Sequence, residues 1–487
     1  MSGFKYKYQM YKKLKEATNQ IHEDAKKAAE EIGIPPELRG KIGLTGASSG
    51  CPAPLREDIK HATMEVSEKV IPLQKLMDEI RDIVKSVYGD EYDAAATNTC
   101  EAGLWVAYNC LLAPPITGIG DNYRARYVLP YEKQLHYTGA YGRPYPPRYK
   151  DFLAERGGTA GELGAFSKRL NNLDTVLVPL VGAKYEVHGI NYHTIPLLLD
   201  VDAQASAAEI DRFADIHRDK LSGIVSLGYD TENYGYGEKA KDGSPLLQKL
   251  YAQTARRYNV PYIVDNAWGV PFIGTDIRKT GADIMVYSMD KATCADTSGL
   301  IIGREEPMIA IRRALGMHGS RRGSTSSYSK SGFSAFDPGK HALASQIQAL
   351  KVIRDKPNVL TQPVDDLEKI VREEFKTIAP KIRAGITIEK SYNSRSVEVN
   401  YERTWVDSEI GLPLFSMEDI PAGTNLICST LNAMGIRPSG ANDGLICLSP
   451  DLGTTDAEGT LIPERARYVV RGLIRTLEII AKYAEYI

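Results

Sequence analysis

Two apolar segments of the sequence end in side chains that can do acid–base and covalent chemistry. The segment PYIVDNA carries Asp265 near its end, and the segment DIMVYSMDK ends in Ser288 and Lys291. Both segments have the length and composition of buried strands. Because ligands of open α/β sheets bind beyond the carboxyl ends of the strands, we expect this carboxylate and this amine to lie at one sheet edge.

A third apolar segment, YDAAATNT, leads directly into a predicted helix. Thr99, Cys100 and Glu101 stand at the start of that helix. The first main-chain N–H groups of a helix have no partner within it, so they can bind a phosphate. An anion site, a carboxylate and a lysine at one sheet edge match the needs of pyridoxal phosphate, and we expect this cofactor. We expect no metal ion and no disulfide, because the six cysteines are scattered and lack metal-ligand spacing.

Each residue type has a part in that chemistry. Lys291 would bind the cofactor aldehyde as a Schiff base and later move a proton at the substrate Cα. Asp265 would pair with the pyridine nitrogen and keep it protonated. Thr99, the main chain at Cys100 and the hydroxyl of Ser288 would hold the phosphate. A lysine after a strand would, by itself, be interpreted as a solvated charge. The prediction for Lys291 therefore depends on Asp265 and Thr99 being present as well.

Further candidates have an equally good structural interpretation. His136 follows the next predicted strand and could stack on the cofactor ring, or it could be a partly buried histidine. Asn233 and Tyr234 could reach the ring oxygen or the substrate, or belong to a Gly-rich surface turn. A substrate α-carboxylate needs a planar bidentate donor, for which Arg437 and Arg395 compete, although either could be a surface charge. Cys100 and Cys294 are interpreted as small core residues.

The elements that must position these residues follow from the hydrophobic pattern. Short apolar runs alternate with helical stretches from residue 92 to 303, which is typical of a parallel sheet with helices on both faces. We expect an N-terminal helical segment at 1–90, a large cofactor-binding domain at 91–335 and a smaller C-terminal α+β domain at 336–487. The expected strand segments are 92–99, 126–130, 175–181, 223–229, 261–267, 283–288 and 299–303.

Composition excludes several classes of protein. The 487 residues are 43% hydrophobic and 25% charged, as in an ordinary globular enzyme. Sixty Lys and Arg against 62 Asp and Glu leave a net charge of -2, so no basic field exists to bind nucleic acid. No apolar run approaches the roughly 18 residues of a membrane span, and the first residues lack a signal-peptide pattern. We therefore expect a cytoplasmic enzyme with a small-molecule substrate and no membrane partner.

The motifs resemble those of a known enzyme class. Three motifs resemble those of the class V aminotransferase and cysteine desulfurase group of fold-type I pyridoxal-phosphate enzymes. TNTCEAG is similar to the phosphate-binding turn of that group, and SMDK is similar to its Ser-x-x-Lys. VDNAWG is similar to its pyridine-nitrogen Asp, with the small residue Ala267 beneath the ring. The similarity runs from about residue 92 to 304. VDNAWGVP and VYSMDKATCADTSGLIIG also resemble selenium transferases that act on phosphoseryl-tRNA. The resemblance implies the fold-type I transferase fold, with a mostly parallel seven-stranded sheet in the large domain.

One residue departs from the family pattern. Enzymes of the cysteine desulfurase type usually have His before the lysine, whereas this chain has Asp290. A carboxylate would repel a phosphate. We therefore expect Asp290 to point to a backbone donor or to a neighbouring subunit, and the departure weakens a desulfurase assignment.

The resemblance implies an enzyme that acts on a small amino acid or a derivative of one. The leading hypothesis is a lyase or transferase that breaks a bond at Cβ; the alternatives are an aminotransferase, then a decarboxylase. A tRNA-linked amino-acid transferase is suggested by the selenium transferases, but the net charge argues against it. A non-catalytic scaffold would not need Asp265 and Lys291.

The resemblance also implies a homodimer with active sites at the subunit interface. Arg321 and Arg322 lie in a Gly/Ser-rich, apolar-poor loop after the lysine strand. We expect one of them to reach the partner's phosphate or substrate carboxylate. The alternative is a pair of arginines that face solvent.

Overall fold

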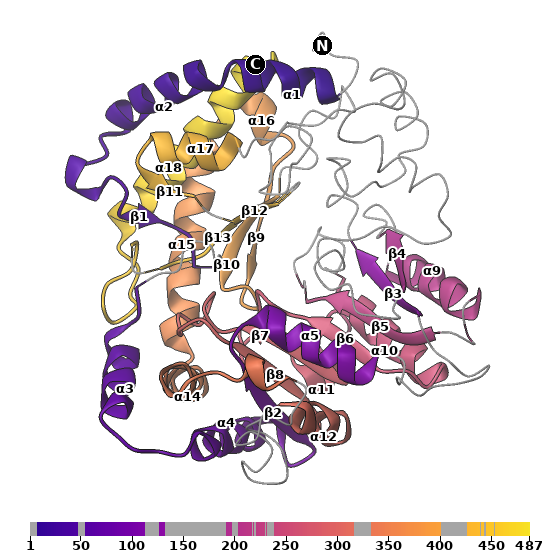
Figure 1. Ribbon diagram of the computed structural model, residues 1–487. Helices are drawn as coiled ribbons and strands as arrows, with labels where there is room; N and C mark the ends of the chain where they lie inside the picture. Colours follow the sequence, from indigo (N-terminus) through magenta and orange to yellow (C-terminus); the bar gives the residue numbers. More distant parts are fainter. Residues whose placement is uncertain are drawn as a thin grey trace.

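The described residues form a large sheet, a small sheet and a two-stranded pair (Figure 1). No helix among the residues that the structure describes is long and apolar enough to cross a membrane. The computed structural model describes residues 7–46, 54–112, 126–131, 191–196, 203–216, 218, 221–228, 230, 238–315, 333–400, 426–438, 440–442, 445–451 and 453–487.

The large sheet is mixed. Its order is β2-β8-β7-β6-β5-β3-β4, and among these described strands only β8 runs antiparallel to its neighbours. Five adjacent strands, from β2 to β5 in this order, have their side chains described, and β3 and β4 extend the sheet to seven. The strands are β2 (Tyr92–Thr97), β3 (Arg126–Tyr131), β4 (Asn191–Pro196), β5 (Leu221–Leu227), β6 (Tyr262–Asp265), β7 (Ile284–Ser288) and β8 (Gly299–Arg304).

The direction of β8 and the place of β4 were not evident from the sequence pattern. Residues 289–298 between β7 and β8 are too few for a helical crossover, so the chain must return antiparallel. β4 at Asn191–Pro196 does not coincide with any expected segment, and the expected strand at 175–181 lies outside the described residues. The expected fold class, an α/β domain with a mostly parallel sheet, is otherwise the observed one.

The strands are apolar on both faces because helices cover both faces. Along β6, Tyr262 and Val264 point into one core and Ile263 into the other, as the two-residue period of a strand requires. The core containing Ile263 is covered by α5 (Cys100–Leu111) and α12 (Glu305–Ala314). The opposite core is covered by α3 (Glu57–Ser67), α4 (Leu73–Tyr88), α9 (Ala203–Ile216), α10 (Leu246–Arg257), α11 (Ile277–Thr280) and α14 (Lys340–Asp355).

The small sheet is antiparallel in the order β12-β13-β10-β9. Figure 1 shows the helices of both chain ends together on this side of the molecule, where they share one core. The strands are β9 (Thr387–Ser391), β10 (Ser396–Asn400), β12 (Gly440–Asn442) and β13 (Leu445–Leu448); the helices are α1 (Lys7–Glu16), α2 (Thr18–Ile32), α15 (Asn358–Glu374), α16 (Pro380–Arg383), α17 (Leu426–Ala433) and α18 (Pro463–Tyr483).

Short elements complete the connections between these layers. β1 (Ile42–Gly43) pairs in parallel with β11 (Ile436–Arg437), which ties the N-terminal segment to the small sheet's side. The expected division at residues 90 and 335 stays a prediction. The 3-10 helices are η1 (Pro36–Leu38), η3 (Ser334–Phe336) and η4 (Phe375–Thr377).

A buried ion cluster joins α4, β2 and α12. The Asp93 carboxylate, fully buried, accepts hydrogen bonds from Arg81 at 2.7 and 3.1 Å and lies 3.0 Å from Nε of Arg312. Burial alone would raise the pKa of Asp93, but the Arg81 hydrogen bonds and the two guanidinium charges lower it below its usual value. The carboxylate is therefore ionised in the folded protein.

Candidate active site

Strand register brings the predicted residues to one edge of the large sheet. β6 and β7 are parallel neighbours, with Asp265 opposite Val286, so Asp265 and Ser288 lie at the same edge. Gly299 of β8 is paired with Ser288 on one side and with Thr97 of β2 on the other. The lysine turn after β7 and the start of α5 after β2 therefore flank the same glycine.

The start of α5 has the geometry of an anion site. Thr99 is the N-cap residue, and its hydroxyl oxygen accepts a hydrogen bond from the N–H of Ala102 at 3.0 Å. Among the described residues, the N–H groups of Cys100 and Glu101 have no acceptor. The Glu101 side chain is exposed. Two unpaired N–H groups at the positive end of a helix of twelve residues suit a phosphate.

Gly299 permits the close approach of α5 to the sheet. A Cβ at this position would lie 2.3 Å from the Thr99 carbonyl oxygen and 2.5 Å from Thr97 Oγ1. Sequence reasoning missed this residue, although a glycine in a strand can indicate a close backbone approach. The predicted phosphate site therefore depends on a glycine one strand away from the predicted lysine.

Asp265 is fixed at the end of β6. Its side chain is buried, and Oδ1 accepts a hydrogen bond from the N–H of Ala267 at 3.1 Å. The N–H of Gly228 donates to the Asp265 carbonyl at 2.7 Å. Both the carboxylate and the main chain of this residue are thus held in place before any ligand binds.

The pKa of the Cys100 thiol depends on burial and on the nearby charges of the site. Burial raises the pKa of its thiol well above the usual range, the Asp265 carboxylate raises it further, and the Lys291 ammonium lowers it. These long-range effects require the three residues to lie near one another. The thiol is neutral, in keeping with its interpretation as a core residue.

Lys291 lies half-buried in the turn that follows β7. Among the described residues, no carboxylate is ion-paired with its amine. The preceding residue, Asp290, is buried and accepts hydrogen bonds from the hydroxyls of Ser288 and Thr297. Two hydroxyls of its own turn, which folds back between β7 and β8, thus bind this carboxylate, and the expectation that Asp290 points to a backbone donor or to another subunit stays a prediction.

The two candidate arginines occupy different places. Arg395 is buried, and its guanidinium donates to the carbonyls of Ala292, Leu360 and Pro450 at 3.1–3.3 Å and to the thiol of Cys294. It therefore lies against the turn that carries Lys291. Its Nη2 makes no hydrogen bond to a described residue.

Arg437 lies on β11, with its side chain exposed. Its Nε donates to the carbonyl of Gly40 at 2.8 Å, and Gly43 of β1 lies opposite it in register. The N-terminal segment thus runs beside this arginine. A role for either arginine in carboxylate binding stays a prediction.

Five of the predicted residues lie outside the described part of the chain. They are His136, Asn233, Tyr234, Arg321 and Arg322. Their roles at the ring, the substrate or the partner subunit stay predictions.

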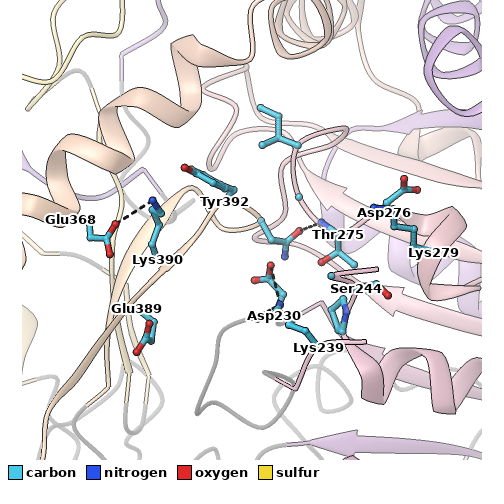
Figure 2. A pocket seen from close by; sticks show the side chains of 15 residues that line it. Asp230, Lys239, Ser244, Thr275, Asp276, Lys279, Glu368, Glu389, Lys390 and Tyr392 are labelled. Carbon is cyan, nitrogen blue, oxygen red and sulfur yellow. Dashed lines mark hydrogen bonds and ion pairs between the residues drawn. The ribbon is translucent and has the colours of Figure 1, made fainter. Parts of the chain in front are cut away.

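A polar cavity of about 510 Å³ lies between the two sheets (Figure 2). Figure 2 shows Glu368, Lys390 and Tyr392 on one side of it and Asp230 and Thr275 on the other. Lys390 donates hydrogen bonds to the carboxylates of Asp365 and Glu368, which raise the pKa of its ammonium group, so this lysine is a paired cation. None of the predicted cofactor residues lines the cavity, and its charges largely neutralise one another.

Comparison with known proteins places the fold. No protein-family model and no curated protein sequence matches the chain. An omega-transaminase from Sphaerobacter thermophilus is 14% identical, with a TM-score of 0.50, over 87% of this chain and 83% of that one. The structural neighbours are fold-type I pyridoxal-phosphate enzymes. The chain has the fold-type I architecture. The resemblance inferred from the motifs is thereby confirmed at the level of the fold.

Two further aminotransferases are similar over most of their length. The ureidoglycine–glyoxylate aminotransferase from Bacillus subtilis is 12% identical over 92% of this chain and 98% of that one, with a TM-score of 0.48. The taurine:2-oxoglutarate aminotransferase from Bifidobacterium kashiwanohense, solved with PLP and glutamate, is 11% identical over 88% and 85%, also with a TM-score of 0.48.

Proposed function

We propose that this fold-type I chain is a pyridoxal-phosphate-dependent enzyme that acts on a small amino acid or amino-acid derivative. The observation that carries the proposal is that three features lie at one edge of the large sheet. They are a buried carboxylate, a lysine without an ion-pair partner among the described residues, and a helix start whose first N–H groups have no acceptor among those residues. When bound, the cofactor supplies an electron sink for charge left at the substrate Cα. The residues present fit its aldehyde, its ring nitrogen and its phosphate.

Each of these residues has an assigned task. Lys291 would attach the aldehyde through its amine and could also move the proton at the substrate Cα. Asp265 would hold the proton on the ring nitrogen, and the N–H of Ala267 keeps the carboxylate oriented. The N–H groups of Cys100 and Glu101 would bind the phosphate. With its hydroxyl bonded to Asp290, Ser288 is an additional phosphate donor only if it exchanges that partner.

We favour aminotransfer as the reaction. The neighbour with a TM-score of 0.50 is an omega-transaminase. Asp290 stands where cysteine desulfurase-type enzymes have His, and it is bonded to two hydroxyls. The first observation supports transfer of the amino group, and the second weakens the desulfurase type of Cβ chemistry that the sequence motifs suggest. A lyase or transferase acting at Cβ is the second candidate, because those motifs are shared with the desulfurase group.

We assign the substrate α-carboxylate to Arg437 in preference to Arg395. Arg437 is exposed beside the N-terminal segment, with its Nε bonded to the Gly40 carbonyl, whereas Arg395 is buried with both Nε and Nη1 bonded to main-chain carbonyls. A carboxylate binds best to two parallel N–H groups of one guanidinium. Arg395 would have to leave the lysine turn to offer them.

We further propose a homodimer in which Arg321 or Arg322 completes the partner's site. Mixed dimers test this directly. Inactive Lys291→Ala chains exchanged with inactive Arg321→Ala/Arg322→Ala chains should regain activity, because one of the two composite sites is then wild type. Confirmed subunit exchange without activity, or an active double arginine variant, refutes the shared site.

A product assay tests the proposed reaction. The cofactor-loaded protein is incubated with a panel of amino acids, with and without a 2-oxo acid, and amino acid, pyruvate, ammonia, sulfide and carbon dioxide are scored separately. Aminotransfer predicts a new amino acid only when the 2-oxo acid is present. Pyruvate and ammonia or sulfide without an acceptor would instead support Cβ elimination, and carbon dioxide would indicate decarboxylation.

Asp265→Asn tests the role of the carboxylate in the same assay. It should retain some cofactor but lose most turnover, because the phosphate contacts remain while the ring nitrogen loses its counter-charge. A variant with near-wild-type turnover would exclude the role assigned to Asp265.

A further inference from the structure

The turn between β9 and β10 leaves its own sheet and docks on the large domain. Figure 1 shows this hairpin extending toward the large sheet. The Ser391 hydroxyl donates to Asp230 Oδ1 at 2.7 Å, and the N–H of Val270 donates to the Asn393 carbonyl at 2.7 Å. The turn therefore meets the loops that follow β5 and β6, at the edge where the predicted site lies.

Asn393 makes every hydrogen bond that its amide can make. Its oxygen accepts from Asn266 Nδ2 at 3.1 Å and from the N–H of Thr275 at 3.0 Å. Its nitrogen donates to the Gly228 carbonyl at 2.6 Å and to Asn266 Oδ1 at 2.9 Å. Both asparagines are buried. A fully satisfied buried amide pair fixes the geometry of the segments it joins.

These contacts enclose Asp265 on both sides. Asn266 is the next residue in the chain, and its N–H donates to the Val286 carbonyl at 2.9 Å. Gly228, which receives the hydrogen bond from Asn393, donates its own N–H to the Asp265 carbonyl. A Cβ at Gly228 would lie 2.1 Å from Asn266 Oδ1, so only a glycine at this position leaves room for the amide pair.

The same turn also reaches the lysine. Arg395 has a φ of +47°, a left-handed conformation that is unfavourable for a residue with a side chain. That conformation is maintained by the docking: Nη1 donates to the carbonyl of Ala292, the residue after Lys291. One turn of the small sheet thus contacts the neighbours of both residues assigned to the cofactor.

We propose that Asn393 is a positioning residue for the Asp265 carboxylate, acting through Asn266 and Gly228. The proposal rests on the proposed function, because Asp265 needs a fixed position only if it meets a ring nitrogen. Without the amide of Asn393, Asn266 loses two hydrogen bonds, and the Gly228 carbonyl loses the N–H that donates to it. The Asp265 main chain then becomes free to move relative to the lysine turn, and the distance between carboxylate and cofactor is no longer fixed.

The test uses Asn393→Ala and Asn393→Asp, with Tyr392→Phe as the matched control. Asn393→Asp keeps the size of the side chain but cannot donate to Gly228. Tyr392→Phe removes one hydrogen bond of the same turn, the bond to Asp365, at a side chain that is 37% exposed. Three properties are measured: the dissociation constant of pyridoxal phosphate, the pH midpoint of its visible absorption when bound, and the melting temperature.

Both Asn393 variants should bind the cofactor about tenfold or more weakly and shift the pH midpoint, since a displaced carboxylate changes ring protonation. Tyr392→Phe should match the wild type in both. A folded Asn393 variant that melts earlier but keeps the wild-type dissociation constant and midpoint overturns the proposal, because the residue would then be only structural.

Hydrogen exchange on the wild-type chain gives an independent test if the variants do not fold. Coupling is reciprocal, so cofactor binding must slow exchange in the peptide that contains residues 391–396. Unchanged exchange there overturns the proposal. A wild-type chain that binds no pyridoxal phosphate would refute the proposed function and this inference with it, whereas a cofactor-bearing chain with unaffected variants refutes the inference alone.

Discussion

Replacing Gly299 by Ala should displace the start of α5 and weaken cofactor binding. The added Cβ would lie 2.3 Å from the Thr99 carbonyl oxygen and 2.5 Å from Thr97 Oγ1. The first of these atoms belongs to the main chain and cannot rotate away, so strand and helix start must separate by about 1 Å to restore normal contact. Overpacking of this kind costs about 1–3 kcal/mol. We expect a fall of that size in the free energy of unfolding, together with weaker binding of pyridoxal phosphate.

Chemical denaturation and cofactor titration measure both effects, and Gly339→Ala is the control. A Cβ at Gly339 would have nothing within 4 Å. This glycine is the N-cap residue of α14, so the loss of a favourable cap and the reduced freedom of the unfolded chain should offset each other to within about 1 kcal/mol. If Gly299→Ala matches the control in stability and in cofactor affinity, the phosphate site does not depend on this close approach.

Three other substitutions give distinct expected outcomes. Asp93→Asn should lower the free energy of unfolding by about 1–3 kcal/mol, because two half-buried guanidinium groups lose the carboxylate that they share. Because the folded-state pKa of Asp93 is depressed, this stabilisation is present above its unfolded pKa and is lost as the pH falls through the folded-state pKa. A variant with the wild-type acid denaturation profile would contradict the assignment. Arg437→Lys should raise KM for a carboxylate substrate and leave the free energy of unfolding nearly unchanged. Arg395→Lys should lower the free energy of unfolding by about 1–3 kcal/mol. If steady-state kinetics and denaturation give the reverse pattern, the roles of the two arginines must be exchanged.

The sequence predicted the residues whose signal is local. Asp265 and Ser288 end apolar strands, Lys291 follows one, and Thr99 precedes a helix as its N-cap. Strand ends and capping chemistry therefore locate these residues without tertiary information. Their meeting at one edge then follows from parallel pairing of β6 and β7. These features depend on short segments, which hydrophobic periodicity describes well.

The contacts between distant segments could not be predicted in this way. Asn266 and Asn393 are 127 residues apart and are bonded only because the small sheet docks on the large one. Nothing in SYNSRS distinguishes Asn393 from an ordinary turn residue. The partners of Asp290 likewise depend on the fold of the turn between β7 and β8, and the antiparallel direction of β8 depends on the length of that turn.

Covalent mapping of the cofactor tests the central claim most directly. The wild-type protein loaded with pyridoxal phosphate is reduced with borohydride, digested and analysed by mass spectrometry, with Lys291→Ala treated in parallel. The account predicts a yellow wild-type protein with the pyridoxyl group on Lys291 and no fixed cofactor in the variant. A pyridoxyl group on another lysine, or equal fixation in Lys291→Ala, would contradict it.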